Sequence, residues 1–156
     1  MKRTLSVLLA LVMCLSMLSF AIPTAEAAGS VAVNSTNFPD EAFRNYVTGN
    51  LDKDGNGTLS AAEIAAVLSI RVNGKGITSI KGVEHFNALE ELYCGYNQLT
   101  ALDVSKNTAL KLLSCYSNQL TALNVSKNTK LETLDCSYNQ LTGLDVSKNT
   151  GLQKLD

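Results

Sequence analysis

LEELYCGYNQLTALDVSKNTA occupies residues 89–109, and near-copies of it follow at 110–130 (LKLLSCYSNQLTALNVSKNTK) and 131–151 (LETLDCSYNQLTGLDVSKNTG). The three copies align without gaps, and 13 of the 21 positions are identical in all of them. One copy cannot bury its own apolar face, so the copies must stack on one another. The repeat therefore predicts an elongated array of coils.

Each copy opens with Leu-x-x-Leu-x-Cys-x-x-Asn, and such a pattern with a period in the twenties is typical of a leucine-rich repeat. Strand alternation directs Leu92 and Cys94 inward and Tyr93 outward. Asn97 follows the strand where the chain turns, and its amide can pair with backbone groups that the turn leaves open. The same position in the later copies predicts an asparagine ladder, which comprises Asn97, Asn118 and Asn139.

A shorter periodicity lies inside each copy, because residues 99–107 again read Leu-x-x-Leu-x-Val-x-x-Asn. We expect both long sides of the coil to be extended, since residues 103–108 mix β-branched residues with turn formers. A divergent coil, longer by one position, precedes the copies and has Lys75 in the asparagine position. The expected fold is an α+β solenoid, in which repeats of 21 or 22 positions form a stack of parallel strands over residues 67–156.

Three cysteines occupy one repeat position, Cys94, Cys115 and Cys136. We expect neutral buried thiols, because a straight ladder among leucines does not converge on a metal. A disulfide between neighbours is feasible by distance, but strands in register aim both side chains the same way and one of the three would remain.

The N-terminus predicts export. A basic start, an apolar run from Leu5 to Phe20 and Ala25-Glu26-Ala27 together indicate a signal peptide over residues 1–27, cleaved after Ala27. The run is shorter than the ~20 residues that a membrane-spanning helix needs. We expect a secreted, extracellular protein with a short linker at 28–36, or one attached to the cell wall through a region beyond residue 156.

Composition excludes several function classes. Removal of Lys2, Arg3 and Glu26 with the signal peptide leaves 11 basic and 13 acidic residues. This nearly balanced charge does not favour binding to nucleic acid or to an anionic membrane. His85 is the only histidine, so a histidine-based triad or zinc site is excluded. We therefore expect a monomer without a catalytic site.

Residues 37–66 precede the repeats and contain a calcium-loop motif. Asp52 to Glu63 reads DKDGNGTLSAAE, which matches the EF-hand loop in its oxygen ligands, its glycine and its closing glutamate. The sequence predicts a structural Ca²⁺ site in a helical cap, with the ligands Asp52, Asp54, Asn56, Thr58 (through its backbone carbonyl), Ser60 and Glu63. The alternative is that Ser60 and Glu63 form only a capping box, which leaves the spacing of the upstream acids unexplained.

The flanks of this loop predict two helices. Pro39, Asp40 and Glu41 suit a helix start, and apolar residues recur on one face of the helix that follows at Phe43, Tyr46, Val47 and Leu51. After the loop we expect a short helix whose apolar face, Ile64, Val67 and Leu68, covers the open end of the stack.

The join of cap and repeats resembles the N-terminus of the internalins and related bacterial surface proteins. The resemblance rests on Asn37-Phe38-Pro39-Asp40, Ala62-Glu63-Ile64 and residues 77–84 (ITSIKGVE). It implies recognition of surface proteins through the concave strand face. Two departures, the intact calcium ligands and the shorter copies with cysteine in a leucine position, mean that host-cell invasion does not carry over.

The outward strand positions are the candidate binding surface for an extracellular protein or glycan. Tyrosines in a polar strip, with an exposed Leu112, combine apolar area with hydroxyl groups. The expected residues are Glu91, Tyr93, Tyr96, Leu112, Ser114, Tyr116, Thr133, Asp135 and Tyr138. The competing interpretation is that these surface residues vary without a ligand.

The chain stops at Leu155-Asp156, within what should be another strand. Because natural solenoids protect that edge, we expect the array to continue. The rival hypothesis is an exported enzyme whose catalytic domain lies beyond residue 156, with the repeats as its targeting module.

Overall fold

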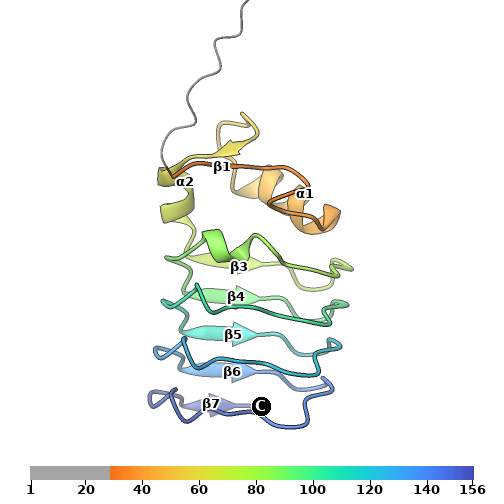
Figure 1. Ribbon diagram of the computed structural model, residues 1–156, viewed down its shortest axis with the longest axis vertical. Coiled ribbons are helices and arrows are strands. Elements are labelled where there is room, and N and C mark those ends of the chain that lie inside the picture. The colour runs from red at the N-terminus through yellow and green to blue at the C-terminus, as the bar shows by residue number, and fades with distance from the viewer. Residues whose placement is uncertain (1–28) are drawn as a thin grey trace, which may run out of the picture.

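The computed structural model describes residues 29–156, and the predicted signal peptide and its cleavage site lie outside the described residues. A small cap sits at the N-terminal end of a stack of coils (Figure 1). The elements in chain order are β1 (Val31–Ala32), α1 (Glu41–Asn50), β2 (Thr58–Leu59), α2 (Ala61–Ala66), β3 (Ser69–Arg71), the 3₁₀ helix η1 (Val83–His85), β4 (Glu91–Tyr93), β5 (Leu112–Ser114), β6 (Thr133–Asp135) and β7 (Lys154–Leu155).

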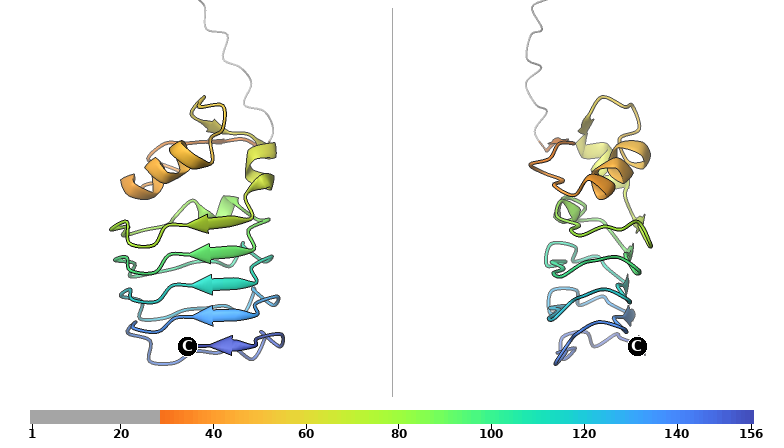
Figure 2. Two further views of the ribbon diagram at one scale, coloured as in Figure 1. Left: turned by 180° about the vertical axis from the view of Figure 1, so that it is seen from behind. Right: turned by 90° about the vertical axis from the view of Figure 1, so that its right-hand side faces the viewer.

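A five-stranded parallel sheet, in the order β3-β4-β5-β6-β7, runs down one side of the stack. Its register pairs the residues of the same repeat position, and the partners in the middle of the strands are Ile70, Leu92, Leu113, Leu134 and Leu155. The strands are therefore one repeat apart, and the predicted leucine-rich-repeat solenoid is confirmed. We call the outward side of this sheet the strand face; it is turned to the viewer in the left panel of Figure 2.

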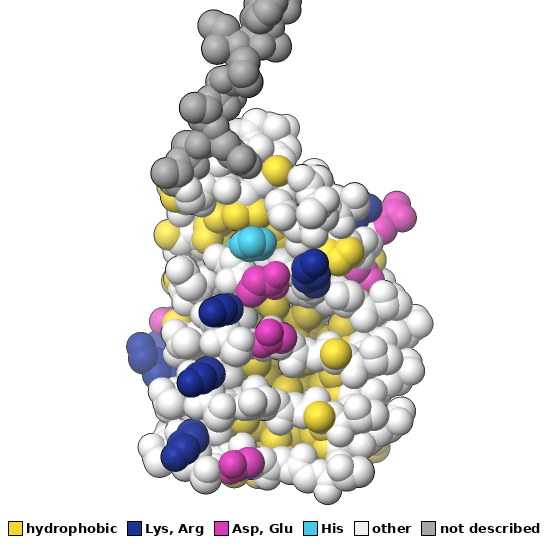
Figure 3. Space-filling model, in the orientation of Figure 1, with side chains coloured by type: hydrophobic (Ala, Val, Ile, Leu, Met, Phe, Trp, Pro, Cys, Tyr) yellow, Lys and Arg dark blue, Asp and Glu magenta, His cyan; other side chains and the backbone are white. Residues whose placement is uncertain are grey.

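The core is a continuous column inside the coils. Leu92, Leu113 and Leu134 are wholly buried, and the cysteines that follow them are also buried. On the return side of the described coils, η1 is the one helical element, so the prediction of little helix there is confirmed; the rest consists of turns and irregular backbone and forms no regular strand, so the expectation that this side is extended like the sheet side is not confirmed. Figure 3 views that return side, where several Lys and Arg side chains follow one margin, acidic side chains lie nearer the middle and apolar ones show between the coils.

Two asparagine ladders hold the coils together. In the predicted one, Asn118 Nδ2 donates to the carbonyls of Cys94 and Cys115 at 3.0 and 2.9 Å, while its Oδ1 accepts from Leu99 N. A second ladder on the return side comprises Asn107, Asn128 and Asn149, each almost fully buried. Asn128 Nδ2 donates to the carbonyls of Val104 and Asn107 at 2.9 Å each. Each coil is thus bonded to the one before it at both of its turns.

Helix α1 begins as predicted, with Asp40 as its N-cap accepting from Phe43 N at 2.9 Å. Phe43 and Val47 are wholly buried. The other Asp40 oxygen, Oδ2, accepts from Thr78 N and Thr78 Oγ1, both at 2.8 Å, and from Ser79 N. Partial burial on its own would raise the pKa of Asp40, but these hydrogen bonds outweigh it and the pKa is lowered. One carboxylate therefore starts the cap helix and fastens it to the first coil.

The second helix is shorter than predicted. Helix α2 ends at Ala66, and Val67 is its C-cap with extended backbone, because the chain must turn at once into β3. Val67 is buried, but Leu68 is 52% exposed. The prediction that Leu68 shares the buried face of α2 is therefore wrong, because an extended chain directs successive side chains to opposite sides.

The segment expected as a linker contains β1, which pairs antiparallel with β2. Val33 N extends this pairing by donating to Gly57 O at 2.9 Å. The N-terminal segment thereby adds a strand to the loop that carries the acidic motif. Within residues 29–156, neither helix has the length and apolar character needed to cross a membrane.

Candidate functional site

The acidic loop between α1 and α2 is folded around its own side chains. Gly57 has a positive φ of 80°, which glycine adopts without strain, and its N–H donates to Asp52 Oδ2 at 2.9 Å. Asn56 N donates to Asp54 Oδ1 and Thr58 N donates to Asn56 Oδ1. The backbone N–H groups of the turn thus hold the side chains of three predicted ligands on one side of the loop.

Asp52, Asp54 and Glu63 bring carboxylate oxygens within 4.8 Å of one another. Asp52 is only 6% exposed, and its Oδ1 is buried without a hydrogen-bond partner among the described residues. A buried carboxylate oxygen without a donor is costly unless a cation is near. Three converging carboxylates suit a hard divalent cation, which prefers oxygen ligands.

Glu63 takes part in both of the alternatives that the sequence leaves open. Its Oε2 accepts from Ser60 N and Ser60 Oγ at 2.8 Å, and Ser60 Oγ accepts in return from Glu63 N, which completes a capping box on α2. Its Oε1 accepts from Lys53 N at 2.6 Å, at the beginning of the loop. These hydrogen bonds lower the pKa of Glu63, and those from Ser60 have the largest effect. Capping therefore does not compete with a place in the acidic cluster.

The strand face carries a charged and aromatic end next to the cap. Arg71 Nη2 lies 2.7 Å from Glu91 Oε2, and the Arg71 guanidinium stands 3.9 Å from the centroid of the Tyr93 ring. Glu91 and Tyr93 are half-buried, as are Thr133 and Asp135 farther along the sheet. These predicted residues thus share one face, as the alternation of a strand requires.

Two residues of the strand face are less exposed to solvent than expected. Leu112, predicted to be exposed, is half-buried, and Ser114 is only 9% exposed. Ser114 lies in register between Tyr93 and Asp135. We attribute the burial of Ser114 to these two larger neighbours, which cover its small side chain. The pattern within one repeat does not predict this burial, because the covering residues come from the adjacent coils.

The remaining predicted surface residues lie where the strands end. Tyr96 is 63% exposed and Tyr138 is 83% exposed. Tyr116 is half-buried, with its ring edge against Tyr96 and the two centroids 4.7 Å apart. Sequence analysis missed this contact, because it joins different positions of two adjacent repeats.

The cysteine ladder is a core feature and not a reactive site. All three cysteines in the described residues are buried and free. Burial raises the pKa of Cys94 to about 12, and burial with the neighbouring thiols also raises the pKa of Cys115. Neutral thiols in an apolar column are poor nucleophiles and poor metal ligands, so the prediction of core packing is confirmed.

Comparisons with known proteins agree with this architecture. A family model named Leucine Rich Repeat matches residues 130–154. Internalin J of Listeria monocytogenes serotype 4b (strain F2365) is 37% identical over 87 residues, which cover 56% of this chain and 10% of that protein. This chain therefore spans about a tenth of that relative.

Solved structures give the same result. The functional domain of internalin J from Listeria monocytogenes, described as including a cysteine ladder, is 37% identical with a TM-score of 0.75, over 81% of this chain and 28% of that one. Internalin C2 from the same species is 24% identical with a TM-score of 0.73, over 81% and 57% of the two chains, and supports the fold alone.

The repeats, their parallel sheet and these matches define the class: the chain is a leucine-rich-repeat solenoid. Within that class the chain is similar to the internalins, and a helical cap lies in front of its first coil.

Proposed function

We propose that this chain is the recognition part of a secreted or surface-attached bacterial protein, which binds an extracellular protein or glycan through the strand face and has no catalytic role. The distribution of variation among the copies carries the proposal. Five of the eight positions that differ between copies fall in the first eight residues, around the strand and its outward side, whereas the return side is nearly invariant. A purely structural stack gives no reason for that asymmetry.

The experiment is to map which face contacts a ligand. A photoreactive residue placed at Thr133 should crosslink to extracellular protein or glycan, because Thr133 is on the strand face. The same residue at Lys127, which is exposed on the return half of the coil, is the matched control. Crosslinking from both positions alike, or from Lys127 alone, would contradict recognition by the strand face.

We also propose that the acidic loop binds Ca²⁺ and stiffens the cap. The carboxylates of Asp52, Asp54 and Glu63, the side chains of Asn56 and Ser60 and the carbonyl of Thr58 would supply the oxygens. The observation that supports the metal best is the buried, unpartnered Oδ1 of Asp52. In a calcium-rich medium an affinity of roughly 10⁻⁴ to 10⁻³ M would suffice.

The N-terminal strand gives a physical reason why one loop can work alone. EF-hand loops normally occur in pairs, and each steadies the other. Here β1 pairs with β2, which lies inside the loop, and Leu59 of β2 is wholly buried. A strand from residues 31–32 thus supplies the backbone support that a second loop would otherwise give.

Glu63→Gln separates calcium binding from helix capping. Glutamine can keep the capping box, since its side chain still accepts from the N-cap backbone, but it removes the charge that a cation needs. Calcium should raise the melting temperature of the unmodified protein, and Glu63→Gln should remove most of that rise. Without calcium the variant should melt somewhat lower than the unmodified protein, because an amide nitrogen in place of Oε1 cannot accept from Lys53 N. Terbium luminescence gives a direct binding readout. A calcium response that survives the substitution would refute the assigned site.

A further inference from the structure

Three tyrosines form a row along the edge where the strands end, and we call Tyr96, Tyr116 and Tyr138 the tyrosine ledge. Tyr96 and Tyr138 have positive φ angles of 52° and 51°. Left-handed backbone is unfavourable for a residue with a side chain, and least so for asparagine. The same backbone recurs at Ser117 (φ 52°), so it belongs to the turn of every copy; at Tyr96 and Tyr138 this turn presents rings that are largely exposed.

The middle tyrosine is seated in a space that the previous coil leaves for it. Gly95 and Tyr116 occupy the same position in consecutive copies. A Cβ at Gly95 would lie 2.4 Å from the Tyr116 ring, so any larger residue there would displace the ring. Seated in this way, Tyr116 meets Tyr96 edge to face at 4.7 Å. The ledge is therefore a shaped surface whose parts come from different copies.

The segments that carry the ledge are uncharged, although Asp135 and Asp156 lie beside Tyr138 and Lys75 lies in the coil before Tyr96. Residues 94–102, 115–123 and 136–144 contain no Asp, Glu, Lys or Arg. Each segment also has an exposed glutamine directly after the ladder asparagine, Gln98, Gln119 and Gln140. Exposed rings and primary amides in the same segments offer apolar faces together with paired hydrogen-bond donors and acceptors. No cationic group lies in these segments to attract phosphate or an acidic peptide.

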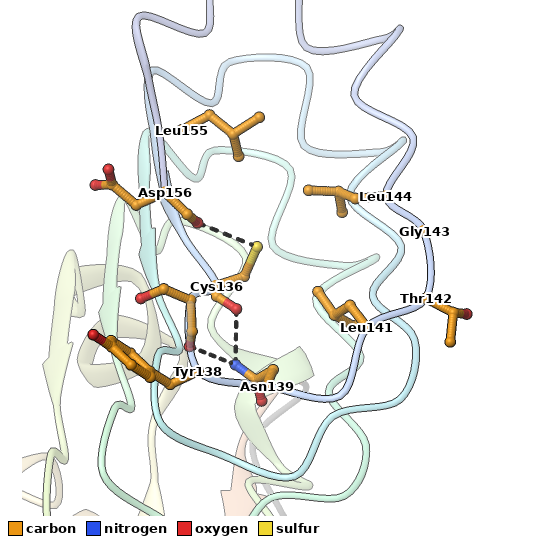
Figure 4. Close-up of a pocket in the computed structure, with 10 residues that line it drawn as sticks. Cys136, Tyr138, Asn139, Leu141, Thr142, Gly143, Leu144, Leu155 and Asp156 are labelled. Carbon is orange, nitrogen blue, oxygen red and sulfur yellow. Dashed lines mark hydrogen bonds between the residues drawn. The ribbon is translucent and has the colours of Figure 1, made fainter.

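The spacing suits a chain-like ligand. Tyr96 and Tyr138 are two coils apart, a separation of about 9.6 Å at the usual distance between strands, which is roughly the length of a disaccharide. In a β-1,4-linked chain the sugar faces repeat every second unit, so both rings could pack on equivalent C–H faces. Figure 4 shows Tyr138 directed away from the interior of its coil, whereas Leu141 and Leu155 point into it. The outer rings are thus free to contact a ligand.

From these observations we infer that the tyrosine ledge binds a neutral β-1,4-linked glycan rich in N-acetyl groups, with the rings packing on sugar faces and the glutamines pairing with acetamido groups. This inference rests on the proposed recognition role of the strand side and names its ligand class.

The probe is chitohexaose, titrated into the full chain in buffer with calcium. Because the chain has five tyrosines and no tryptophan, tyrosine fluorescence reports the binding, and calorimetry checks it. The double variant Tyr96→Asn, Tyr138→Asn should weaken binding at least tenfold. Its melting temperature should be unchanged or higher, since asparagine tolerates the left-handed backbone. Ser117→Asn, at the same left-handed position of the middle coil (φ 52°), is the matched control for that backbone effect.

Absence of saturable binding up to millimolar chitohexaose would overturn the inference, and so would binding that survives the double variant. If the double variant instead reduces protein crosslinking from Thr133, the ledge serves a protein ligand. In that case the glycan inference fails while the proposed recognition role stands.

Discussion

The cap and the repeats are stabilised in opposite ways. In the cap each polar contact occurs once: Asp40 joins the start of α1 to Thr78 and Ser79, the Tyr46 hydroxyl of α1 accepts from Arg71 N, and Glu63 joins α2 to the acidic loop. In the repeats the same bond recurs from coil to coil, as in Asn97, Asn118 and Asn139. A lost contact in the cap should therefore stay local, whereas a lost ladder residue should interrupt a cooperative array.

The largest effect is expected in the middle of the repeats. Asn118→Ala leaves the N–H of Leu99 without a partner and removes one of the two amide donors to each of the carbonyls of Cys94 and Cys115, which keep their bonds from Asn97 and Asn139. We expect a loss of about 3 to 5 kcal/mol in the free energy of unfolding, since a buried group without a partner costs about 1–3 kcal/mol and each of the two lost hydrogen bonds about 1 kcal/mol. Gln119→Ala changes the exposed neighbour and should cost less than about 0.5 kcal/mol. Denaturant melts that coincide for the two variants would exclude the ladder as a source of cooperativity.

A smaller loss of stability is expected at the junction between the cap and the first coil. Asp40→Ala removes the N-cap of α1 and the bonds to Thr78 and Ser79, at a cost of about 2 kcal/mol. Hydrogen exchange should speed up in α1 and leave β5 and β6 unchanged. Asp40→Asn keeps an N-capping side chain and should recover part of the loss. Faster exchange throughout β5 and β6 would mean that cap and repeats form one cooperative unit.

The smallest effects are expected from pH, and they should divide the molecule. Asp40 and Glu63 have lowered pKa values, so their contribution is complete above the ordinary carboxyl values and is lost as the pH falls through the lowered ones. Asp103 and Asp145 in the repeats also have lowered pKa values, but each bonds only within its own turn, to Ser105 or Ser147. Acid should therefore loosen the cap first, where Asp40 and Glu63 join separate segments.

Alkali should act on the repeats. The raised pKa of Cys94, about 12, means that its contribution is complete below the ordinary thiol value of 9.0 and is lost as the pH rises toward 12. Exchange at α1 and at β5, followed from acid to alkaline pH, measures both trends. If β5 responds to acid before α1, the assignment of these groups is wrong.

The period made the solenoid, its register and the buried cysteines predictable, because a residue at the same position in every copy must meet its equivalents. The start of α1 was predictable too, because the Asp40 side chain caps the helix through a bond to Phe43 N, only three residues away. Even the second ladder had a signal, as Asn107 ends a half-repeat that mirrors the first. The metal ligands could be named from spacing, although their binding of Ca²⁺ is still a proposal.

What the sequence did not predict depends on contacts between distant segments. β1 has two residues and forms only because the loop at Thr58–Leu59 offers a partner. Ser114 is covered by residues one repeat before and one repeat after it. Tyr116 needs the absence of a side chain at Gly95. None of these relations follows from a residue's own propensity.

The constant step between successive coils has a consequence for how such a chain can change length. Every coil from β4 onward presents the same partners to the next, as the hydrogen bonds of Asn118 and Asn139 illustrate. Duplication or excision of one whole copy would leave the ladder bonds and the buried column intact, because the asparagine, leucine and cysteine positions are identical in all three copies. Unequal recombination between such similar copies could therefore lengthen or shorten the array within a single generation, without an unstable intermediate.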